Sequence, residues 1–530
     1  LSPTPSSPML LTRRGVLGLG LGAVAAAVLA SCTPAPQWVT PTGAAVSGTE
    51  KNRGGTGRVT TVDLTGAPTT LDLAGTAAAT WAFGGIPAPV IRLTAGDTLK
   101  ATVRNQLDAD TSVHWHGLAL RNDMDGVPPV TQAPIAPGGQ FAYEFVTPHP
   151  GTYWFHPHVG PQLDHGLYGA LIIDDPDEKV TWDDEWVLIL DDWLDGVTAT
   201  PDQVLTDLSK GMGDMGGMGD MFMRMGNLLM GATSELLGGD AGDVYYPQYL
   251  INGKPKADPA QFTGTPGARV RIRVINAGSD TAFRFAIGGH TLTITHTDGF
   301  PVDPVEVDSV LIGMGERYDL QVTLDDGVFP VVADAEGKQD RAFALVRTAA
   351  GTAPASDVPV AELGTGRVGT AAGLSATASV TLHQASPDRV VHLALTGGME
   401  AYDWGINGRR FDMNDPLRDA HAVSMGERVQ LRIRNDTEMW HPFHLHGHTY
   451  QHANGGPRKD TSIILPGQTL TVDFDADNPG QWVAHCHNIY HAETGRPRCS
   501  DTSHEPRVHP QHGRMIARAI GRRRRTSSLS

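Results

Sequence analysis

The stretch from Trp482 to Gly495 reads W-V-A-H-C-H-N-I-Y-H-A-E-T-G, and it constrains the fold of this chain more than any other. Because side chains alternate along a β-strand, His485 and His487 would point to one face and Cys486 to the other. A cysteine sulfur with imidazoles in a trigonal arrangement is the ligand set of an electron-transfer copper site, and His491 can complete it. One short segment is therefore predicted to serve two metal sites.

Three further clusters also contain histidines two residues apart. M-W-H-P-F-H-L-H-G-H lies upstream of the cysteine, and H-W-H-G and W-F-H-P-H come much earlier. A single H-x-H pair usually consists of surface or hydrogen-bonded core histidines, and a lone H-C-H could belong to a structural zinc site. Four clusters in one chain favour metal binding instead. Their histidines are His114, His116, His156, His158, His441, His444, His446, His485, His487 and His491.

With these motifs the chain resembles the multicopper oxidases, the superfamily of laccases and copper-efflux oxidases. The resemblance rests on H-W-H-G, H-P-H, H-P-F-H-L-H-G and H-C-H-N-I-Y-H, and it spans residues 55–495. It is closest to the exported actinobacterial members. It implies an all-β fold of three consecutive cupredoxin-like β-sandwich domains with Greek-key topology, and four copper ions as cofactors.

The resemblance also implies a ligand set. A type 1 copper would be held by His441, Cys486 and His491. A trinuclear centre would hold a type 2 copper on His114 and His444, one type 3 copper on His116, His156 and His487, and the other on His158, His446 and His485. Asp125 matches an acidic residue that the family keeps near the oxygen site, so it is a candidate proton relay. The alternative is that Asp125 serves only as a turn residue before Gly126.

Length and composition agree with several β-rich domains. A chain of 530 residues is too long for one core, and 62 glycines and 37 prolines indicate many turns. Alternating segments predict domains at 58–175, 184–350 and 380–495. The middle one contains none of the four motifs, and its His290 and His296 are expected to be core or surface residues. Shared ligands require the first and last domains to pack together.

Charge and cysteine content exclude some partners. The net charge of −17 argues against nucleic acid and favours cations such as metal ions. Only three cysteines occur, so no disulfide framework is expected and Cys486 is free to bind metal as a thiolate. We expect a monomer.

The N-terminus has the features of an export signal. T-R-R-G-V-L-G precedes a short apolar run, which is typical of the Tat route for folded proteins. The run ends in L-A-S-C, which resembles a lipoprotein processing site that would leave Cys32 lipidated and attached to the membrane; a secreted soluble protein is the alternative. We therefore expect a signal at 1–31, a flexible tether at 32–57 and a location in the cell envelope or outside the cell.

A methionine-rich insertion at 207–239 suggests a soft metal substrate. Its glycines break any helical spacing, and thioethers suit Cu(I); a mobile apolar flap is the alternative. The candidate ligands are Met212, Met215, Met218, Met221, Met223 and Met225. Glu438 and Met439, just before His441, resemble the carboxylate and methionine through which metal-oxidising members take up Cu(I). The alternative is a solvated Glu438 and a core Met439.

Residues 496–530 depart from the family pattern. Arg496 stands where the family usually has an axial methionine, no apolar alternation predicts a closing strand, and the end is strongly basic. A reading-frame shift or an authentic basic tail would account for the change. Met515 is the alternative axial ligand.

The predicted function is an oxidase that couples one-electron oxidation of Cu(I), with Fe(II) or phenols as other donors, to four-electron reduction of dioxygen to water. A role in copper tolerance follows from a Cu(I) substrate. The alternatives are a general laccase, a copper-sequestering protein without turnover and, more weakly, a copper nitrite reductase. Because Cys486 lies between His485 and His487, a few covalent bonds would join the two metal sites.

Overall fold

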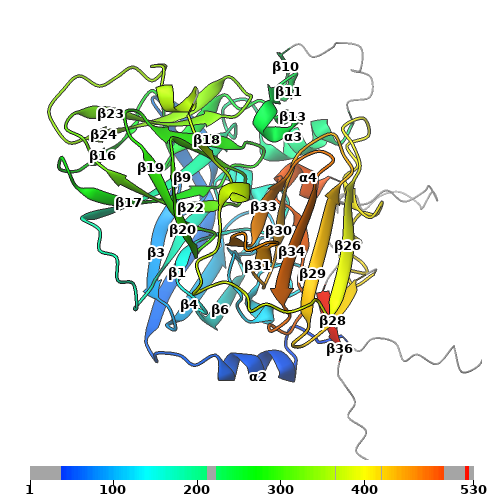
Figure 1. The fold of residues 1–530 in the computed structure, drawn as a ribbon. Coiled ribbons are helices and arrows are strands. Elements are labelled where there is room, and N and C mark those ends of the chain that lie inside the picture. Colours follow the sequence, from blue (N-terminus) through cyan, green and yellow to red (C-terminus); the bar gives the residue numbers. More distant parts are fainter. Residues whose placement is uncertain (1–37, 212–221, 365, 419, 495–519, 524–530) are drawn as a thin grey trace, which may run out of the picture. The chain divides into compact units, whose positions relative to one another are not determined.

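The computed structural model describes residues 38–211, 222–364, 366–418, 420–494 and 520–523 (Figure 1). Strands dominate these residues, so the predicted all-β class is confirmed. The export signal, Cys32, Arg496, Met515 and the methionines from Met212 to Met221 lie outside the described residues. Within the described part of the chain, no helix has the length and apolar character needed to cross a membrane.

Two sheets form the first domain. One has the strand order β2-β1-β4-β6 and the other β3-β8-β7-β5. The strands are β1 (Val59–Leu73), β2 (Thr76–Phe83), β3 (Ala88–Thr94), β4 (Thr98–Asn105), β5 (His114–His116), β6 (Gln140–Val146), β7 (Gly151–His156) and β8 (Gly169–Asp174). Every second residue of β4 is buried, as expected for a strand with one face on a core. Two 3₁₀ turns, η1 (Asn122–Met124) and η2 (Gln162–His165), lie in the connections.

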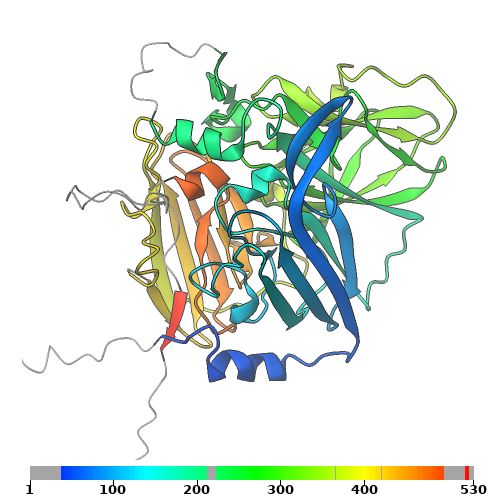
Figure 2. The same cartoon turned by 180° about the vertical axis from the view of Figure 1, so that it is seen from behind.

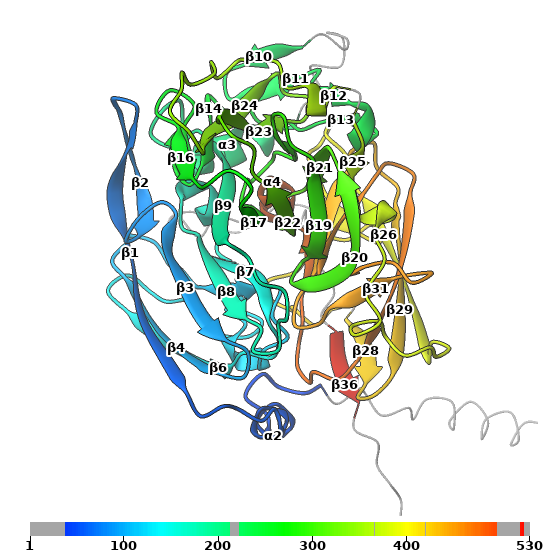
Figure 3. The same cartoon turned by 60° about the vertical axis from the view of Figure 1, so that its left-hand side comes forward.

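The second domain is larger, with sheet orders β15-β14-β9-β17-β22-β19-β20 and β16-β24-β23-β18-β21-β25. The first sheet contains β9 (Asp184–Trp193), β14 (Gln248–Ile251), β15 (Lys254–Pro255), β17 (Arg269–Asn276), β19 (Leu292–Thr297), β20 (Phe300–Val307) and β22 (Arg317–Thr323). The second contains β16 (Ala260–Thr263), β18 (Phe283–Ile287), β21 (Ser309–Ile312), β23 (Val328–Ala335), β24 (Asp340–Arg347) and β25 (Val368–Gly369). Figure 3 shows β7 of the first domain beside β17 and β22, which contact it. Two 3₁₀ turns, η5 (Ala361–Leu363) and η6 (Ala371–Gly373), flank β25.

The insertion within the second domain is partly described. It comprises α3 (Pro201–Leu208), β10 (Met223–Met225), β11 (Leu228–Met230), β12 (Thr233–Ser234), η4 (Glu235–Leu237) and β13 (Gly239–Asp240). Thr200 and Gln203 form a reciprocal capping box that begins α3. Met223 of β10 pairs with Met230 of β11 in a short antiparallel hairpin.

The third domain has the sheet orders β27-β26-β29-β34-β31-β32 and β33-β30-β35. Its strands are β26 (Arg389–Thr396), β27 (Gly405–Ile406), β28 (His421–Ser424), β29 (Arg428–Asn435), β30 (His441–Leu445), β31 (Tyr450–His452), β32 (Arg458–Lys459), β33 (Thr461–Ile464), β34 (Thr469–Asp475) and β35 (Ala484–Cys486). The short helix α4 (Ile489–Glu493) follows β35, and the Asn488 side chain caps it by accepting from the Tyr490 and His491 N–H groups.

Two sequence-based expectations need correction. Within the predicted flexible tether, α2 (Ala44–Asn52) forms a helix, which is dark blue in Figure 2. It packs on both outer domains, because Glu50 accepts from the Val146 N–H and Arg53 donates to Asn478. Within the tail, where no strand was expected, β36 (Ile520–Arg523) pairs in parallel with β28. An exposed edge strand offers unpaired backbone groups, so pairing there does not need apolar alternation.

Candidate metal centres

Strand pairing brings the histidine motifs together. His114 of β5 lies opposite His156 of β7, and His444 of β30 lies opposite His485 of β35. Residues two apart on a strand share one face, so His116 joins His114. The ten histidines of the four motifs and Cys486 are all buried, and none is more than 7% exposed.

Eight histidines from the first and third domains form one cluster. Donor nitrogens within each of three groups lie within 4.8 Å of one another. The groups are His116, His156 and His487; His158, His446 and His485; and His114, His116 and His444. The rings of His116 and His444, which come from different domains, stack with their centroids 3.8 Å apart. The predicted packing of the outer domains thus occurs at the histidine cluster.

A second, sulfur-containing site adjoins this cluster. The Cys486 Sγ lies 3.4 Å from His441 Nδ1 and 3.7 Å from His491 Nδ1. The Trp404 ring packs on both imidazoles, with its centroid 4.3 Å from that of His491 and 5.2 Å from that of His441. Burial raises the pKa of the Cys486 thiol, so a bound cation is needed to hold it as a thiolate. Among the described residues, Cys486 is a free cysteine.

The donor atoms fit soft or intermediate transition metals. Burial lowers the pKa of His485 to about 3 and that of His491 to about 4, so these imidazoles are neutral and can donate a lone pair. Within the eight-histidine cluster, six buried ring nitrogens lack a hydrogen-bond partner in the described chain, which is unfavourable unless a metal binds them. These are His114 Nε2, His116 Nδ1, His156 Nε2, His444 Nε2, and both ring nitrogens of His487. Imidazoles with one thiolate suit copper, whereas calcium and magnesium prefer oxygen ligands.

Hydrogen bonds fix which ring nitrogen faces each site. His114 Nδ1 donates to the Asp125 carbonyl at 2.8 Å and His446 Nδ1 donates to Asp125 Oδ2 at 3.0 Å, which leaves both Nε2 atoms for metal. His441 Nε2 donates to Thr437 Oγ1 at 2.8 Å, which leaves Nδ1 for the sulfur site. Asp125 also begins a turn, since Gly126 has φ +76°. It therefore combines the turn position with direct contacts to two predicted ligands.

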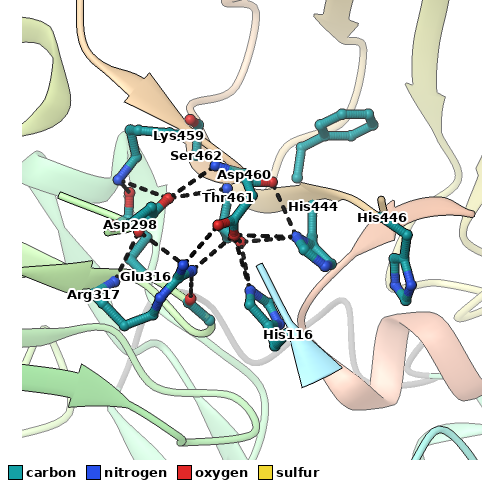
Figure 4. Close-up of polar contacts among 12 residues, drawn as sticks. His116, Asp298, Glu316, Arg317, His444, His446, Lys459, Asp460, Thr461 and Ser462 are labelled. Atoms are coloured by element: carbon teal, nitrogen blue, oxygen red, sulfur yellow. Dashed lines mark hydrogen bonds and ion pairs between the residues drawn. The ribbon is translucent and has the colours of Figure 1, made fainter. Parts of the chain in front are cut away.

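Asp460 is a site residue that the sequence analysis missed. Its Oδ1 accepts from His116 Nε2 at 3.0 Å and its carbonyl accepts from His444 Nδ1 at 3.0 Å (Figure 4). Burial alone would raise the pKa of Asp460, but the Arg317 guanidinium and the histidine hydrogen bonds hold that pKa well below its usual range. An aspartate in R-K-D-T gives no periodic or spacing signal, so only the fold reveals its contacts.

The proposed Cu(I) uptake residues are only partly brought together. Glu438 is exposed, whereas Met439 is 1% exposed and packs in the hydrophobic core. These positions match the alternative of a solvated Glu438 and a core Met439. The carboxylate near the sulfur site is instead that of Asp243, whose Oδ2 lies 3.7 Å from His491 Nε2. Met223 and Met225 are half-buried in the β10–β11 hairpin.

Known proteins are similar to this chain in both sequence and fold. The multicopper oxidase family is matched over residues 67–178, 184–352 and 384–496. The chain is 47% identical to "Multicopper oxidase MmcO" of Mycobacterium tuberculosis, over 91% of this chain and 95% of that protein. It is 28% identical to "Copper resistance protein A" of Escherichia coli, over 78% and 87%, and 29% identical to "Laccase-1" of Botryotinia fuckeliana, over 81% and 79%.

Solved structures agree with the three-domain cupredoxin-like fold. The laccase from Botrytis aclada superposes with a TM-score of 0.69, at 24% identity, over 91% of both chains. Fet3p, described as a multicopper oxidase that functions in iron import, gives a TM-score of 0.68 at 20% identity, over 82% of this chain and 88% of its own. The histidine clusters are consistent with the four coppers typical of the family. This chain belongs to the multicopper oxidase family.

Proposed function

We propose that this oxidase takes electrons from Cu(I) in preference to phenols and serves in copper tolerance. The observation that carries the proposal is the buried Asp243 carboxylate, 3.7 Å from the His491 ring nitrogen that faces away from Cys486. Burial and the Asp280 charge raise the pKa of Asp243 to about 8, so this group ionises when a cation binds beside it. A small cation fits such a buried site, whereas a phenol would need an open apolar surface. The similarity to relatives named for copper resistance supports the role in copper tolerance.

The two metal sites are assigned as the sequence predicts. The type 1 copper would be held by His441, Cys486 and His491, the type 2 copper by His114 and His444, and the type 3 pair by His116, His156 and His487 and by His158, His446 and His485. Bound copper supplies one-electron chemistry at the sulfur site and four-electron reduction of dioxygen to water at the histidine cluster. Cys486 connects the two ligand sets covalently through its neighbours His485 and His487.

The surrounding residues orient the ligands and exclude water. Thr437 and Asp125 fix the tautomers of His441 and His446, so that the metal-facing nitrogens carry lone pairs. Trp404 covers the two imidazoles of the sulfur site with an indole that offers no lone pair to a metal. Asp125, the buried carboxylate beside His114 and His446, is the proposed proton relay.

Steady-state oxygen consumption by the copper-loaded protein tests the substrate. We expect Cu(I) to give a higher kcat/KM than a simple phenol. Asp243→Asn should lower kcat/KM for Cu(I) by about tenfold and change phenol oxidation less, because an amide cannot ionise to pair with a bound cation. Glu438→Gln tests the exposed carboxylate in the same assay. If the parent has equal kcat/KM values for Cu(I) and phenol, or if Asp243→Asn keeps the parent kcat/KM for Cu(I), the proposal is wrong and the enzyme is a general laccase.

Export is part of the proposal. Twin arginines at Arg13 and Arg14 before an apolar run support the Tat route, and the L-A-S-C motif supports lipidation of Cys32. Changing both arginines to lysine should leave the protein in the cytoplasm, as cell fractionation would show. Unchanged export would exclude the Tat route.

A further inference from the structure

The middle domain supplies none of the proposed copper ligands, yet one of its side chains reaches the histidine cluster. Arg317, at the start of β22, has a side chain that is 0% exposed. Its two terminal nitrogens donate to both carboxylate oxygens of Asp460 in the third domain, at 2.8 and 2.7 Å. Its Nε donates at 3.0 Å to the carbonyl of Thr152 in the first domain. This one guanidinium therefore contacts all three domains.

Asp460 and the adjacent Thr461 hold two rings of the cluster. Asp460 Oδ1 accepts from His116 Nε2 at 3.0 Å, and the Asp460 carbonyl accepts from His444 Nδ1 at 3.0 Å. Thr461 Oγ1 lies 3.1 Å from each of these ring nitrogens and donates to Asp460 Oδ1 at 2.8 Å. These contacts leave His116 Nδ1 and His444 Nε2 without protein partners.

Arg317 determines how the Asp460 carboxylate is turned. A guanidinium forms two parallel hydrogen bonds with a carboxylate only when the two groups are nearly coplanar, so a bidentate pair fixes orientation as well as charge. Oδ1 is thereby held toward His116 while Oδ2 faces the second nitrogen of Arg317. A lysine at this position would keep the charge but would not fix the plane.

A second set of buried ions holds the backbone of the same segment. Asp298 Oδ2 accepts from the Asp460 and Thr461 N–H groups at 3.2 and 3.1 Å, and Asp298 Oδ1 accepts from the Arg317 N–H at 2.9 Å. Lys459 Nζ lies 3.2 Å from Asp298 and 3.1 Å from Glu316 (Figure 4). Backbone and side chain of Asp460 are thus both tied to the middle domain.

We propose that Arg317 is a positioning residue for the three-copper site. Acting through Asp460, it sets the orientation of His116 and His444, and so the middle domain controls the geometry of a centre to which it gives no ligand. The inference rests on the assignment of these two histidines to the trinuclear site. It is independent of which donor the enzyme oxidises.

The test compares Arg317→Lys with a matched buried arginine. Arg271, on β17 of the same sheet, pairs with the buried Asp319. Asp319 also contacts Thr152, Arg273 and His296, none of which belongs to the histidine cluster. Both variants are loaded with copper and examined for copper content, electron paramagnetic resonance and oxygen turnover. Arg317→Lys should keep the blue type 1 signal, shift the hyperfine splitting of the type 2 copper and lower kcat by about tenfold. Arg271→Lys should leave the type 2 spectrum unchanged.

A neutral pair separates positioning from simple stabilisation of the domain contact. Arg317→Gln with Asp460→Asn removes both buried charges at similar volume, so thermal stability should recover relative to Arg317→Gln alone. If Arg317 positions the histidines, the type 2 spectrum stays altered although stability recovers. Should the double variant regain the parent spectrum, or should Arg317→Lys show the parent spectrum and kcat, the proposal is wrong. Because these spectra need no donor, a failed Cu(I) assay would not affect the result.

Discussion

Asp125 and Asp460 each contact two of the eight clustered histidines, and they do so with different partners. Asp125 contacts His114 and His446, and Asp460 contacts His116 and His444. Both carboxylates are fully buried. The Asp460 charge is compensated by Arg317, which suits a fixed structural anion, whereas Asp125 contacts imidazoles and is the proposed relay.

Replacing Asp125 by asparagine tests the relay. The amide oxygen can still accept from His446, so copper content and blue colour should stay at the parent level. An amide cannot exchange a proton at neutral pH, so we expect oxygen turnover to fall by roughly tenfold or more. Asp123→Asn, at a half-buried residue paired with Arg121, is the control. If Asp125→Asn keeps the parent rate of oxygen turnover, Asp125 is not a proton relay and serves only as a turn residue.

At the scale of elements, η2 connects the first domain to α3 through His165. This ring stacks on Trp81 of β2, and its nitrogens contact Asp195 and Asp202. Burial alone would lower the pKa of His165, but hydrogen bonds from the ring to the two carboxylates and their charges raise it to about 9. The protonated ring is therefore part of the packing between β2, η2 and α3.

This contact predicts a pH dependence of stability. The folded-state pKa of about 9 lies above the unfolded value of 6.5, so the stabilisation is complete below pH 6.5 and is lost as pH rises through 9. Its size is on the order of 3 kcal/mol. The parent should lose more unfolding free energy than His165→Gln between these pH values, measured by chemical denaturation. The exposed His392→Gln should behave like the parent, and identical slopes for His165→Gln and the parent would contradict the assignment.

Helix α2 provides a second test at this scale. Glu50 accepts from the Val146 backbone and pairs with Arg53, whereas Lys51 in the same helix is exposed. Glu50→Ala leaves the Val146 N–H without its acceptor and should lower the unfolding free energy by about 1 kcal/mol. Lys51→Ala should change it little. Equal stabilities would mean that α2 adds no stability through this contact.

At the scale of the whole molecule, the sequence predicts the metal ligands far better than their supports. His114 and Cys486 belong to dense motifs of residue types that bind copper, and strand spacing already separates the two faces of the H-C-H segment. Arg317 and Asp243 lie in ordinary strand and loop sequence, so their burial follows only from how the domains pack. The helix at Ala44–Asn52 was missed for the same reason, because contacts with two domains stabilise it rather than its own composition.

The most direct test of the account is the copper content of fully loaded Cys486→Ser beside that of the parent. If the thiol and the eight-histidine cluster are separate sites, the parent should hold about four coppers per chain, the number typical of the family. The variant should lose only the sulfur site and keep about three, because serine is a poor copper ligand and the clustered histidines are unchanged. A parent with one copper or fewer, or a variant that loses all of its copper, would contradict the account.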